Sequence, residues 1–241
     1  SMNNMLRRFV QLLALIAAAG CAHLPAGHIG DTRDPWERYN RAVFEFNDTL
    51  DRAVVKPVAE AYRDYVPELA QRSLRNVFSN LRDVIITAHQ LLQGKPQAAM
   101  TAGSRVLINS TIGALGLGDP ASEMGLIKTN EDFGQTFGRW GIGPGPYFVL
   151  PLLGPSTVRD TIGTLADFNF DPIGSVFEQG AGRNIVYGLI AIDRRKDLLD
   201  AQDTIEALSF DRYSGVRDAW LARRRSLVYD GEPPPIKIKE D

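Results

Sequence analysis

Side chains capable of metal or redox chemistry are few in this chain. Its 241 residues include a single cysteine, Cys21, and three histidines, which are His23, His28 and His89. One cysteine cannot form an intramolecular disulfide, a thiolate metal cluster or a C-x-x-C redox pair, but it leaves a lone modified thiol possible. Because two of the histidines lie close to the N-terminus, a multi-histidine zinc site cannot be assembled. We therefore expect no metal site and no cofactor.

Motifs for nucleotide and nucleic-acid chemistry are also missing. The segment GLGDPA at residues 116–121 loosely matches a dinucleotide-binding fingerprint, but Pro120 interrupts it and no β-α-β alternation surrounds it. The sequence contains no Walker motif. Its 27 basic and 29 acidic residues give a net charge of −2 with no strongly basic domain. This balance argues against nucleic acid as a partner.

The clearest group of spaced polar residues falls on one expected helix. Ser156 begins this helix, which runs to about residue 168. Its polar residues recur at positions i, i+3, i+7 and i+10, and they are Thr157, Asp160, Thr164 and Asp167. This spacing predicts one polar face opposite an apolar one. A polar face of this kind is usually solvated, but in a protein seated in a membrane it can line a water-accessible channel, and the spacing leaves both interpretations open.

The N-terminus has the pattern of a secretory signal peptide. Residues 7–20 read RRFVQLLALIAAAG, in which two arginines precede an uncharged apolar run that ends in small residues. The run from Phe9 to Ala19 is too short to span roughly 30 Å of hydrocarbon at about 1.5 Å per residue. This length disfavours the alternative of a transmembrane anchor. We expect residues 1–20 to form a signal peptide.

The residues around Cys21 indicate a use for an unpaired cysteine in an exported protein. The segment AAGC at residues 18–21 resembles the lipobox of bacterial lipoproteins, in which the cysteine is lipidated and becomes the mature N-terminus. The lipobox pattern prefers Leu where this chain has Ala18. Several acyl chains, at about 0.8 kcal/mol per buried CH₂, anchor a protein firmly. By the same resemblance Ala22 favours the outer membrane, and residues 21–33 are expected to be a lipidated flexible tether.

The first helix expected in the body of the chain is unusually aromatic. Asp34, Pro35 and Glu37 form a helix start with Asp34 as the cap. The apolar residues that follow, most of them at helical spacing, are Trp36, Tyr39, Val43, Phe44, Phe46 and Leu50. Such a stripe can face the protein core or a membrane interface. The candidates for interface contacts are Trp36, Tyr39, Phe44 and Phe46.

The remaining periodicity predicts further helices. Pro57 and Pro67 are expected to break the chain, and a long helix follows over residues 68–93. Helical patterns also cover residues 97–115 and residues 184–228, the latter in two segments divided near Phe210. The arginine run at residues 223–225 is typical of a solvated helix end. We expect residues 34–228 to form a single helical domain and residues 229–241 to be a disordered tail.

One apolar segment does not fit a regular helix. Residues 140–158 read WGIGPGPYFVLPLLGPSTV and carry no charge, but four prolines and four glycines exclude a lipid-exposed helix. Irregular backbone of this kind either packs as a buried structural loop or lies at a cavity or interface, and the sequence leaves both open. A short hairpin is possible within residues 142–150. No other alternating strands are evident, so the sequence predicts an all-α fold with at most a short hairpin.

Six blocks of this sequence resemble, in order and spacing, the VacJ/MlaA family of outer-membrane lipoproteins. The blocks are DPWERYNRAVFEFND, KPVAEAYRDYVP, FSNLRD, LINSTIGALGLGDPA, EDFGQTFGRWGIGPGPYFVLPLLGPSTVRD and ADFNFDP. They extend over about residues 34–175, and the lipobox precedes them as the family requires. Residues 184–241 are less distinctive and contribute less to the resemblance.

The resemblance implies a membrane-associated, ring-like bundle of amphipathic helices in the inner leaflet of the outer membrane of a Gram-negative bacterium. Phospholipids misplaced in the outer leaflet would pass through an amphipathic central channel to a soluble periplasmic phospholipid carrier protein, and then to an inner-membrane ABC transporter. This retrograde transport would maintain outer-membrane lipid asymmetry. The family also binds trimeric porins.

The resemblance also assigns residues. Asp160 and Asp167 match the channel-facing helix of the family, which has further acidic positions where this chain has Thr161 and Thr164. We expect the channel lining to include Thr157, Asp160, Thr164 and Asp167. The stretch from residue 117 to residue 132 corresponds to a loop thought to gate the channel, and its apolar candidates are Leu126 and Ile127.

Three functions compete at this point. The first is a non-enzymatic lipid conduit, the second is a phospholipid hydrolase, and the third is a structural lipoprotein that scaffolds porins without needing a channel. The sequence has no G-x-S-x-G motif, and Ser156 lies far in sequence from His89, the only histidine in the body of the chain. Sequence distance does not forbid a catalytic triad. We nevertheless expect the protein not to be an enzyme.

Overall fold

The computed structural model describes residues 31–176, 180–199 and 211–235, and within these ranges the chain is mainly helical. The predicted signal peptide, Cys21 and most of the predicted tether lie outside the described residues, as do Phe210 and the end of the predicted tail. The elements are α2 (Glu37–Leu50), η1 (Asp51–Val55), α3 (Lys56–Tyr65), α4 (Glu68–Leu92), α5 (Pro96–Thr111), α6 (Pro120–Glu123), α7 (Phe133–Arg139), β1 (Tyr147–Leu150), β2 (Gly154–Thr157), α8 (Val158–Phe170), α9 (Pro172–Val176), α10 (Ala181–Asp197) and α12 (Arg212–Val228). The all-α prediction with one short hairpin is confirmed.

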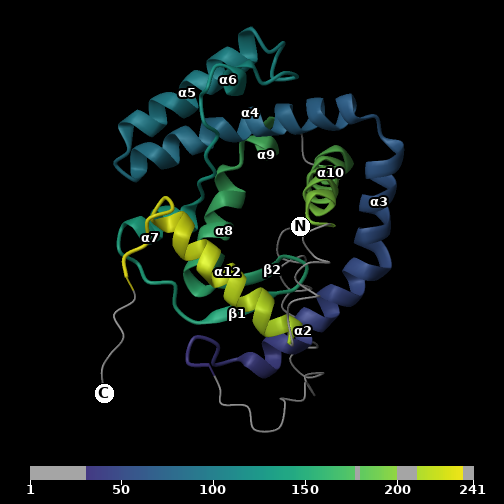
Figure 1. Ribbon diagram of the computed structural model, residues 1–241, viewed down its shortest axis with the longest axis vertical. Helices are drawn as coiled ribbons and strands as arrows, with labels where there is room; N and C mark the ends of the chain where they lie inside the picture. Colours follow the sequence, from purple (N-terminus) through teal and green to yellow (C-terminus); the bar gives the residue numbers. More distant parts are fainter. Residues whose placement is uncertain (1–30, 177–179, 200–210, 236–241) are drawn as a thin grey trace.

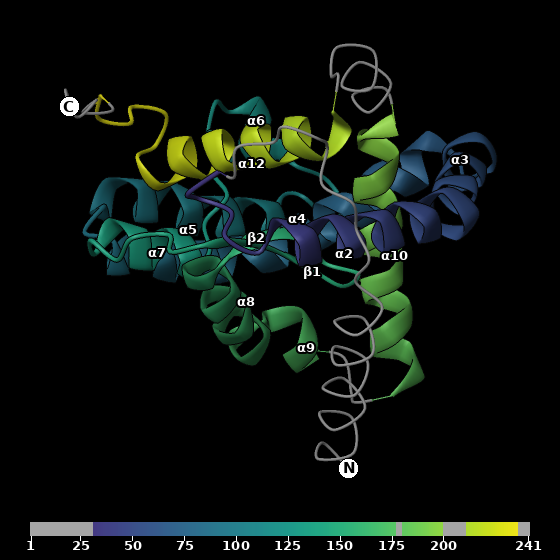
Figure 2. The ribbon, with the colours of Figure 1, turned by 90° about the horizontal axis from the view of Figure 1, so that it is seen from below.

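The helices form an arc around an inner region. Figure 1 shows α2, α3 and α4 following one another around the lower right, the right side and the top, with α8 and α9 inside and α12 running diagonally from beside α7 to α2. α10 lies within the arc and is seen nearly along its axis. Figure 2 shows α2 to α5 in one flat layer that α10 crosses steeply. Among the described helices, none combines the length and apolar character needed to cross a membrane.

Pro57 does not break the chain as the sequence predicted. α2 runs without interruption through η1, a π-helix, into α3. A proline inside an α-helix removes a hydrogen bond, and its ring clashes with the carbonyl group four residues earlier. The wider π-turn lies over the residues just before Pro57, where it relieves this clash. Pro67 does end a helix, because α3 stops at Tyr65 and α4 begins after Pro67.

The predicted long helix is confirmed as α4, which packs against α5 as an antiparallel pair. The connection between them needs a left-handed residue, and Gly94 supplies it with φ of +74°. The backbone of this connection is held by a hydrogen bond from Lys95 N to Gln90 O at 2.8 Å. α5 ends in a glycine-rich turn that leads into α6, where Asp119 caps the helix by accepting from Ser122 N.

A small apolar core lies where α2, β1 and α12 meet. It consists of Val43, Tyr147, Val149 and Tyr213, each no more than 3% exposed. β1 and β2 form an antiparallel hairpin in which Tyr147 faces Thr157. The apolar segment at residues 140–158 is thus partly a buried structural element, whereas its position at a cavity or interface stays a prediction. Its strand β1 contributes to the core, whereas exposed apolar side chains occur at Trp140, Ile142, Leu152 and Leu153.

Candidate functional site

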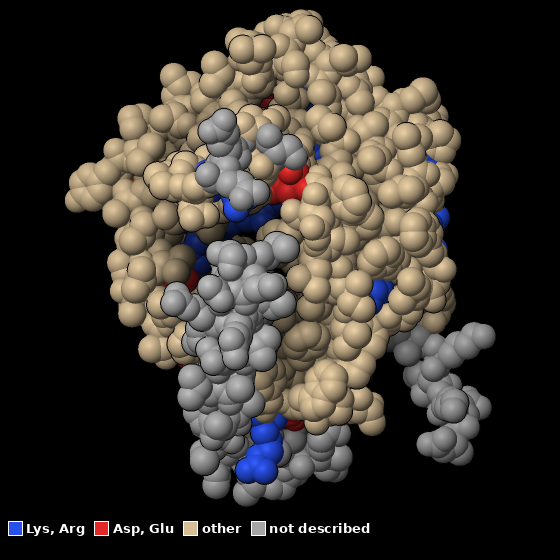
Figure 3. Space-filling view, turned by 180° about the vertical axis from the view of Figure 1, so that it is seen from behind, with Lys and Arg blue, Asp and Glu red and all other residues tan. Residues whose placement is uncertain are grey.

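The outer surface of the α3 to α6 region carries many exposed apolar side chains. The most exposed, with their accessible fractions, are Tyr65 (84%), Leu69 (77%), Leu107 (68%), Leu115 (82%) and Ile127 (78%). The face shown in Figure 3 has few charged side chains outside a central hollow. Scattered apolar residues are normal on a soluble protein, but a large contiguous apolar surface marks a binding or membrane surface.

The inner face of the same helices is polar. Arg105 of α5 is 1% exposed and donates from Nε to Oδ2 of Asp83, also 1% exposed, at 3.2 Å. Its Nη2 donates to both carboxylate oxygens of Asp119 at 3.0 Å. Burial acts to raise the pKa of Asp119, but hydrogen bonds from Ser122, Asn109 and Arg105 outweigh it and lower the pKa to about 2. This network ties α4, α5 and α6 together.

The loop predicted to gate the channel is attached to that network. Lys128 donates from Nζ to Oδ1 of Asp83 at 2.5 Å, and Arg105 donates from Nη1 to the carbonyl oxygen of Leu126 at 2.6 Å. Leu126 is half-buried, whereas Ile127 is exposed. Burial among these groups lowers the pKa of Lys128. Gating by Leu126 and Ile127 stays a prediction.

A second buried network joins α7, α8 and α12. Arg224 donates to Asp132 at 2.7 and 3.0 Å and to Oδ1 of Asp160 at 2.8 Å. Burial acts to raise the pKa of Asp132, but the hydrogen bonds and charge of Arg224 outweigh it and lower the pKa to about 2. The sequence interpretation of residues 223–225 as a solvated run is wrong for Arg224. Its partners lie 92 and 64 residues away, so no local pattern could reveal them.

α7 and α8 approach so closely that glycine is required at their crossing. A Cβ atom on Gly163 of α8 would lie 2.4 Å from the backbone N of Gly134 in α7. A Cβ atom on Gly134 would lie 2.4 Å from Oδ1 of Asp160. These two glycines therefore allow the backbones to meet beside the Arg224 network.

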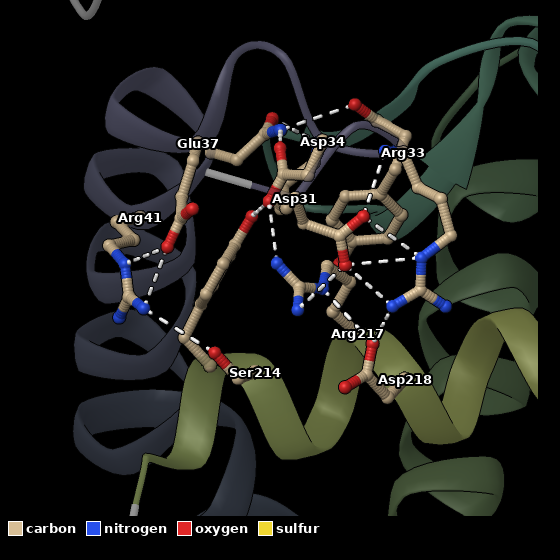
Figure 4. A network of polar contacts seen from close by, with 12 residues as sticks. Asp31, Arg33, Asp34, Glu37, Arg41, Ser214, Arg217 and Asp218 are labelled. Carbon is tan, nitrogen blue, oxygen red and sulfur yellow. Dashed lines mark hydrogen bonds and ion pairs between the residues drawn. The ribbon is translucent and has the colours of Figure 1, made fainter. Parts of the chain in front are cut away.

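Figure 4 shows a third network, which ties the N-terminal segment to α12. The Asp34 carboxylate accepts from Asn40 Nδ2 at 2.6 Å, from Arg217 Nη1 at 3.3 Å and from the Tyr213 hydroxyl. Asp34 is thus not a helix cap as predicted, because α2 begins later, at Glu37, and the Asp34 side chain is used in tertiary contacts. Arg41 adds a link to Asp211 at 2.5 Å.

Two of the four predicted channel-lining residues are buried. Thr157 is 1% exposed and caps α8, accepting from Asp160 N, so this helix starts at Val158 and not at Ser156. Asp160 is 5% exposed and is held by Arg159, Arg224 and the Thr157 hydroxyl. Because their polar atoms are engaged within the protein, the channel-lining prediction is wrong for Thr157 and Asp160.

The other two residues on the α8 stripe are half-buried. The Thr164 hydroxyl donates to the carbonyl oxygen of Asp160 at 2.8 Å, and Asp167 Oδ1 accepts from Phe133 N at 3.1 Å. The buried His89 places Nε2 3.6 Å from Asp167 Oδ1 and pairs through Nδ1 with the Thr136 hydroxyl at 3.0 Å. A channel-lining role for Thr164 and Asp167 stays a prediction.

The aromatic residues of α2 divide between core and surface. Tyr39 and Phe44 pack against the apolar core, while Trp36 and Phe46 are 48% and 43% exposed. Trp36 and Tyr39 also line a shallow apolar groove together with Phe148, Val158, Thr161 and Ile162. Trp36 and Phe148 meet edge to face at 6.1 Å between ring centroids. Contact of Trp36, Tyr39, Phe44 and Phe46 with a membrane interface stays a prediction.

The hollow visible in Figure 3 contains Lys or Arg and Asp or Glu side chains, in contrast to the uncharged surface around it. Arg194 of α10 has the properties of a residue in such a hollow. Arg194 remains accessible to solvent. Partial desolvation by the surrounding protein, together with the charge of Arg82, lowers its pKa. Within the described ranges, no group of three or more His, Cys, Asp or Glu side chains is arranged to hold a metal ion.

Comparison with known proteins places the chain in a family. The MlaA lipoprotein family model matches residues 32–227. The intermembrane phospholipid transport system lipoprotein MlaA of Escherichia coli strain K12 is 35% identical over 236 residues, which cover 95% of this chain and 92% of the relative. The lipoprotein of the same name from Haemophilus influenzae is 29% identical over 225 residues, covering 92% and 90% of the two chains.

A solved structure supports the same conclusion. A chain from work on the structural basis for maintenance of bacterial outer membrane lipid asymmetry superimposes with a TM-score of 0.70 at 35% identity. The similarity covers 81% of this chain and 98% of the solved one. From its sequence and its fold, the chain therefore belongs to the MlaA lipoprotein family.

Proposed function

We propose that this protein is a non-enzymatic phospholipid conduit of the outer membrane, which moves misplaced phospholipids from the outer leaflet toward the periplasm. The observation that carries the proposal is the contrast between the exposed leucines of α4 and α5 and the charged hollow of Figure 3. An amphipathic lipid needs both environments along its path. Similarity to proteins named as an intermembrane phospholipid transport system supports this assignment.

The polarity pattern suggests how a lipid would move. Head groups would follow the charged hollow of Figure 3. On α8, the half-buried Thr164 and Asp167 are the candidates for contact with them. Acyl tails would follow apolar surfaces, and Leu126 and Ile127 are the candidates for a gate. Movement of this kind follows the lipid gradient, so the conduit itself needs no nucleotide and no catalytic residue.

The proposal also gives the protein a place and partners. Lipidated Cys21 would anchor it to the periplasmic face of the outer membrane, with the exposed apolar wall in the inner leaflet. A trimeric porin would bind it there, and a soluble periplasmic carrier would receive the lipid. Replacing Cys21 by Ser is expected to leave the protein soluble or mislocalised, and normal outer-membrane fractionation of this variant would refute the anchor.

Reconstitution tests the proposal. The purified protein is placed in vesicles that contain a fluorescent phospholipid, and transfer to the purified periplasmic carrier is measured against protein-free vesicles. We expect transfer that depends on the protein and produces no lyso-phospholipid. Absence of transfer under any condition would exclude the conduit and favour the porin scaffold. Appearance of lyso-phospholipid would instead support a hydrolase.

A further inference from the structure

Two arginines in the inner region differ from their neighbours in having no ion-pair partner among the residues that the structure describes. On α4, Arg75 pairs with Asp193 of α10 at 3.0 Å, and on α10, Arg195 pairs with Asp51 at 2.7 Å. Arg82 of α4 and Arg194 of α10, by contrast, make no hydrogen bond or ion pair with any residue that the structure describes. An arginine is always charged and holds five donors, so a guanidinium group without a protein partner beside paired neighbours is available to a ligand.

The fold brings these two guanidinium groups toward one region. Arg82 follows Arg75 by seven residues, so both lie on the same face of α4. The buried Asp193 fixes α10 to that face through Arg75, and Arg194 is the next residue of α10. α4 also contacts α9, which follows Asp171. Three elements thus converge on the interior of the arc, in agreement with the charged hollow of Figure 3.

The local electrostatics favour an anion. Burial lowers the pKa of Arg194, and the positive charge of Arg82 lowers it further, whereas Asp171 and Asp193 act in the opposite direction. Neither carboxylate is an open partner. Asp193 is held by Arg75, and Asp171 accepts from the Tyr187 hydroxyl and from Ile173 N at 3.0 Å. Two cations held near each other repel, and a bound anion converts that repulsion into attraction.

We propose that Arg82 and Arg194 together bind the phosphodiester group of a phospholipid as it passes through the hollow. This proposal deepens the conduit function and rests on it. A phosphodiester carries one negative charge and two free oxygens, which suit the planar fork of a guanidinium group. Its acyl chains need apolar surface nearby, whereas a free phosphate ion does not. The arginine pair would hold the head group without specificity for what lies beyond the phosphate.

Lipid binding to the purified full-length protein tests the site. The protein in neutral detergent is titrated with dioleoylphosphatidylglycerol and, separately, with dioleoylglycerol, which has the same chains and no phosphate. Native mass spectrometry gives the Kd for each lipid. In the double variant R82Q/R194Q we expect the Kd for the phospholipid to rise about tenfold or more, because charged hydrogen bonds are lost. The Kd for dioleoylglycerol is expected to change less than about twofold, since no phosphate contact exists to lose.

Two further variants control the experiment. R139Q removes an exposed arginine from the end of α7 and is expected to leave both Kd values unchanged. R82K/R194K keeps the charge but loses the two-pronged geometry, and an intermediate loss is expected. If the glutamine variant fails to fold, the lysine variant carries the test. Equal Kd values for phospholipid and dioleoylglycerol in the wild type, or no change in either arginine variant, would overturn the proposal.

Competition by inorganic phosphate distinguishes a site for a phospholipid head group from a site for a free phosphate ion. We expect it to compete with dioleoylphosphatidylglycerol only weakly, because it lacks acyl chains. Binding of inorganic phosphate as tight as that of the lipid would make this a free-anion site and overturn the lipid assignment. The transfer assay separates the two proposals. Normal transfer by R82Q/R194Q would reject the arginine site alone, whereas no transfer by the wild type with intact phospholipid binding would reject the conduit alone.

Discussion

The region where α2, β1 and α12 meet differs from the region of α4 and α5, which we call the inverted region, in what each exposes. The first has Val43, Tyr147 and Val149 at its centre beside the buried Asp34–Arg217 pair, and charged groups such as Arg33 and Asp218 outside. The second buries Asp83 and Arg105 and exposes Leu107 and Leu115. Both are regular helical packings, so helix formation does not explain the difference. The two regions are suited to different surroundings, one aqueous and the other apolar.

The inverted region also depends on different forces. In water, apolar burial stabilises a fold, while a buried ion pair costs desolvation that its own attraction only partly repays. Against lipid tails, exposed leucines are favourable, and polar groups must find partners inside the protein. The Arg105 network meets that requirement, because its donors reach Asp83, Asp119, Ser122 and the Leu126 carbonyl.

Removal of Arg105 is expected to damage the inverted region most. Arg105→Met removes one of the two cations, Arg105 and Lys128, that hold the buried Asp83, and it leaves Asp119 without the arginine that pairs with it. Breaking a buried ion pair on one side costs about 3–5 kcal/mol. The free energy of unfolding, measured by denaturant titration in detergent, is expected to fall by this amount.

The matched control for this change is Arg72→Met. Arg72 forms an exposed ion pair with Glu68 one turn away on α4. We expect the free energy of unfolding to fall by less than about 1 kcal/mol. Equal losses for the two variants would mean that the Arg105 network does not hold α4, α5 and α6 together.

Polar replacement of the exposed leucines tests whether the outer surface of the inverted region contacts lipid. Leu107→Asn with Leu115→Asn removes two apolar side chains that already face outward. We expect binding to phospholipid vesicles to weaken by about 3 kcal/mol, at roughly 1.5 kcal/mol per side chain. The thermal midpoint in detergent-free buffer is expected to stay the same or rise. Unchanged vesicle binding, measured by flotation, would show that this wall does not contact lipid.

The conventional core is expected to respond as a soluble protein does. Val149→Ala deletes two methyl groups from a side chain with 0% exposure and leaves a small cavity. The free energy of unfolding is expected to fall by about 2 kcal/mol, with no effect on vesicle binding. The opposite pattern, with weakened vesicle binding and normal stability, would contradict the division into two regions.

Acid is expected to weaken the α7, α8 and α12 junction through Asp132. Arg224 lowers the folded-state pKa of Asp132 from 3.8 to about 2, so ionised Asp132 stabilises the fold above pH 4. That contribution, about 1–2 kcal/mol after allowance for partial exposure, is lost as the pH falls from about 4 to 2. In Asp132→Asn the fall in unfolding free energy over this interval is expected to be shallower. An identical pH profile would show that Asp132 is not coupled to folding.

The sequence predicted the elements better than it predicted their orientation. The period of apolar residues located α4 correctly, because helix period is a local property. The same helix has one apolar and one polar face, and nothing local states which face is inside. A chain judged by the rules for water would bury Leu69 and Leu91 and expose Asp83, the reverse of what is found.

The candidate site was predicted least well where long-range contacts decide the outcome. The spacing placed Thr157, Asp160, Thr164 and Asp167 on one polar stripe, but it could not show that Thr157 caps α8 or that Arg224 from α12 pairs with Asp160. Pro57 does not break the helix, because the π-helix just before it accommodates the proline ring. That Arg82 and Arg194 find no ion-pair partner within the described part of the chain is likewise a property of the assembled arc and has no local sequence signal.

The most direct test compares the environments of the outer wall and the interior. In a Cys21→Ser background, a single cysteine replaces either Leu115 on the outside of the glycine-rich turn or Thr164 on α8. Each protein is labelled with a fluorophore and incorporated into vesicles by detergent removal, because the acyl anchor is missing. Quenching by brominated acyl chains is measured in vesicles. We predict strong quenching at position 115 and weak quenching at position 164, where water-soluble iodide quenches instead. Equal quenching by brominated lipid at both positions would contradict a lipid-facing wall around a polar interior.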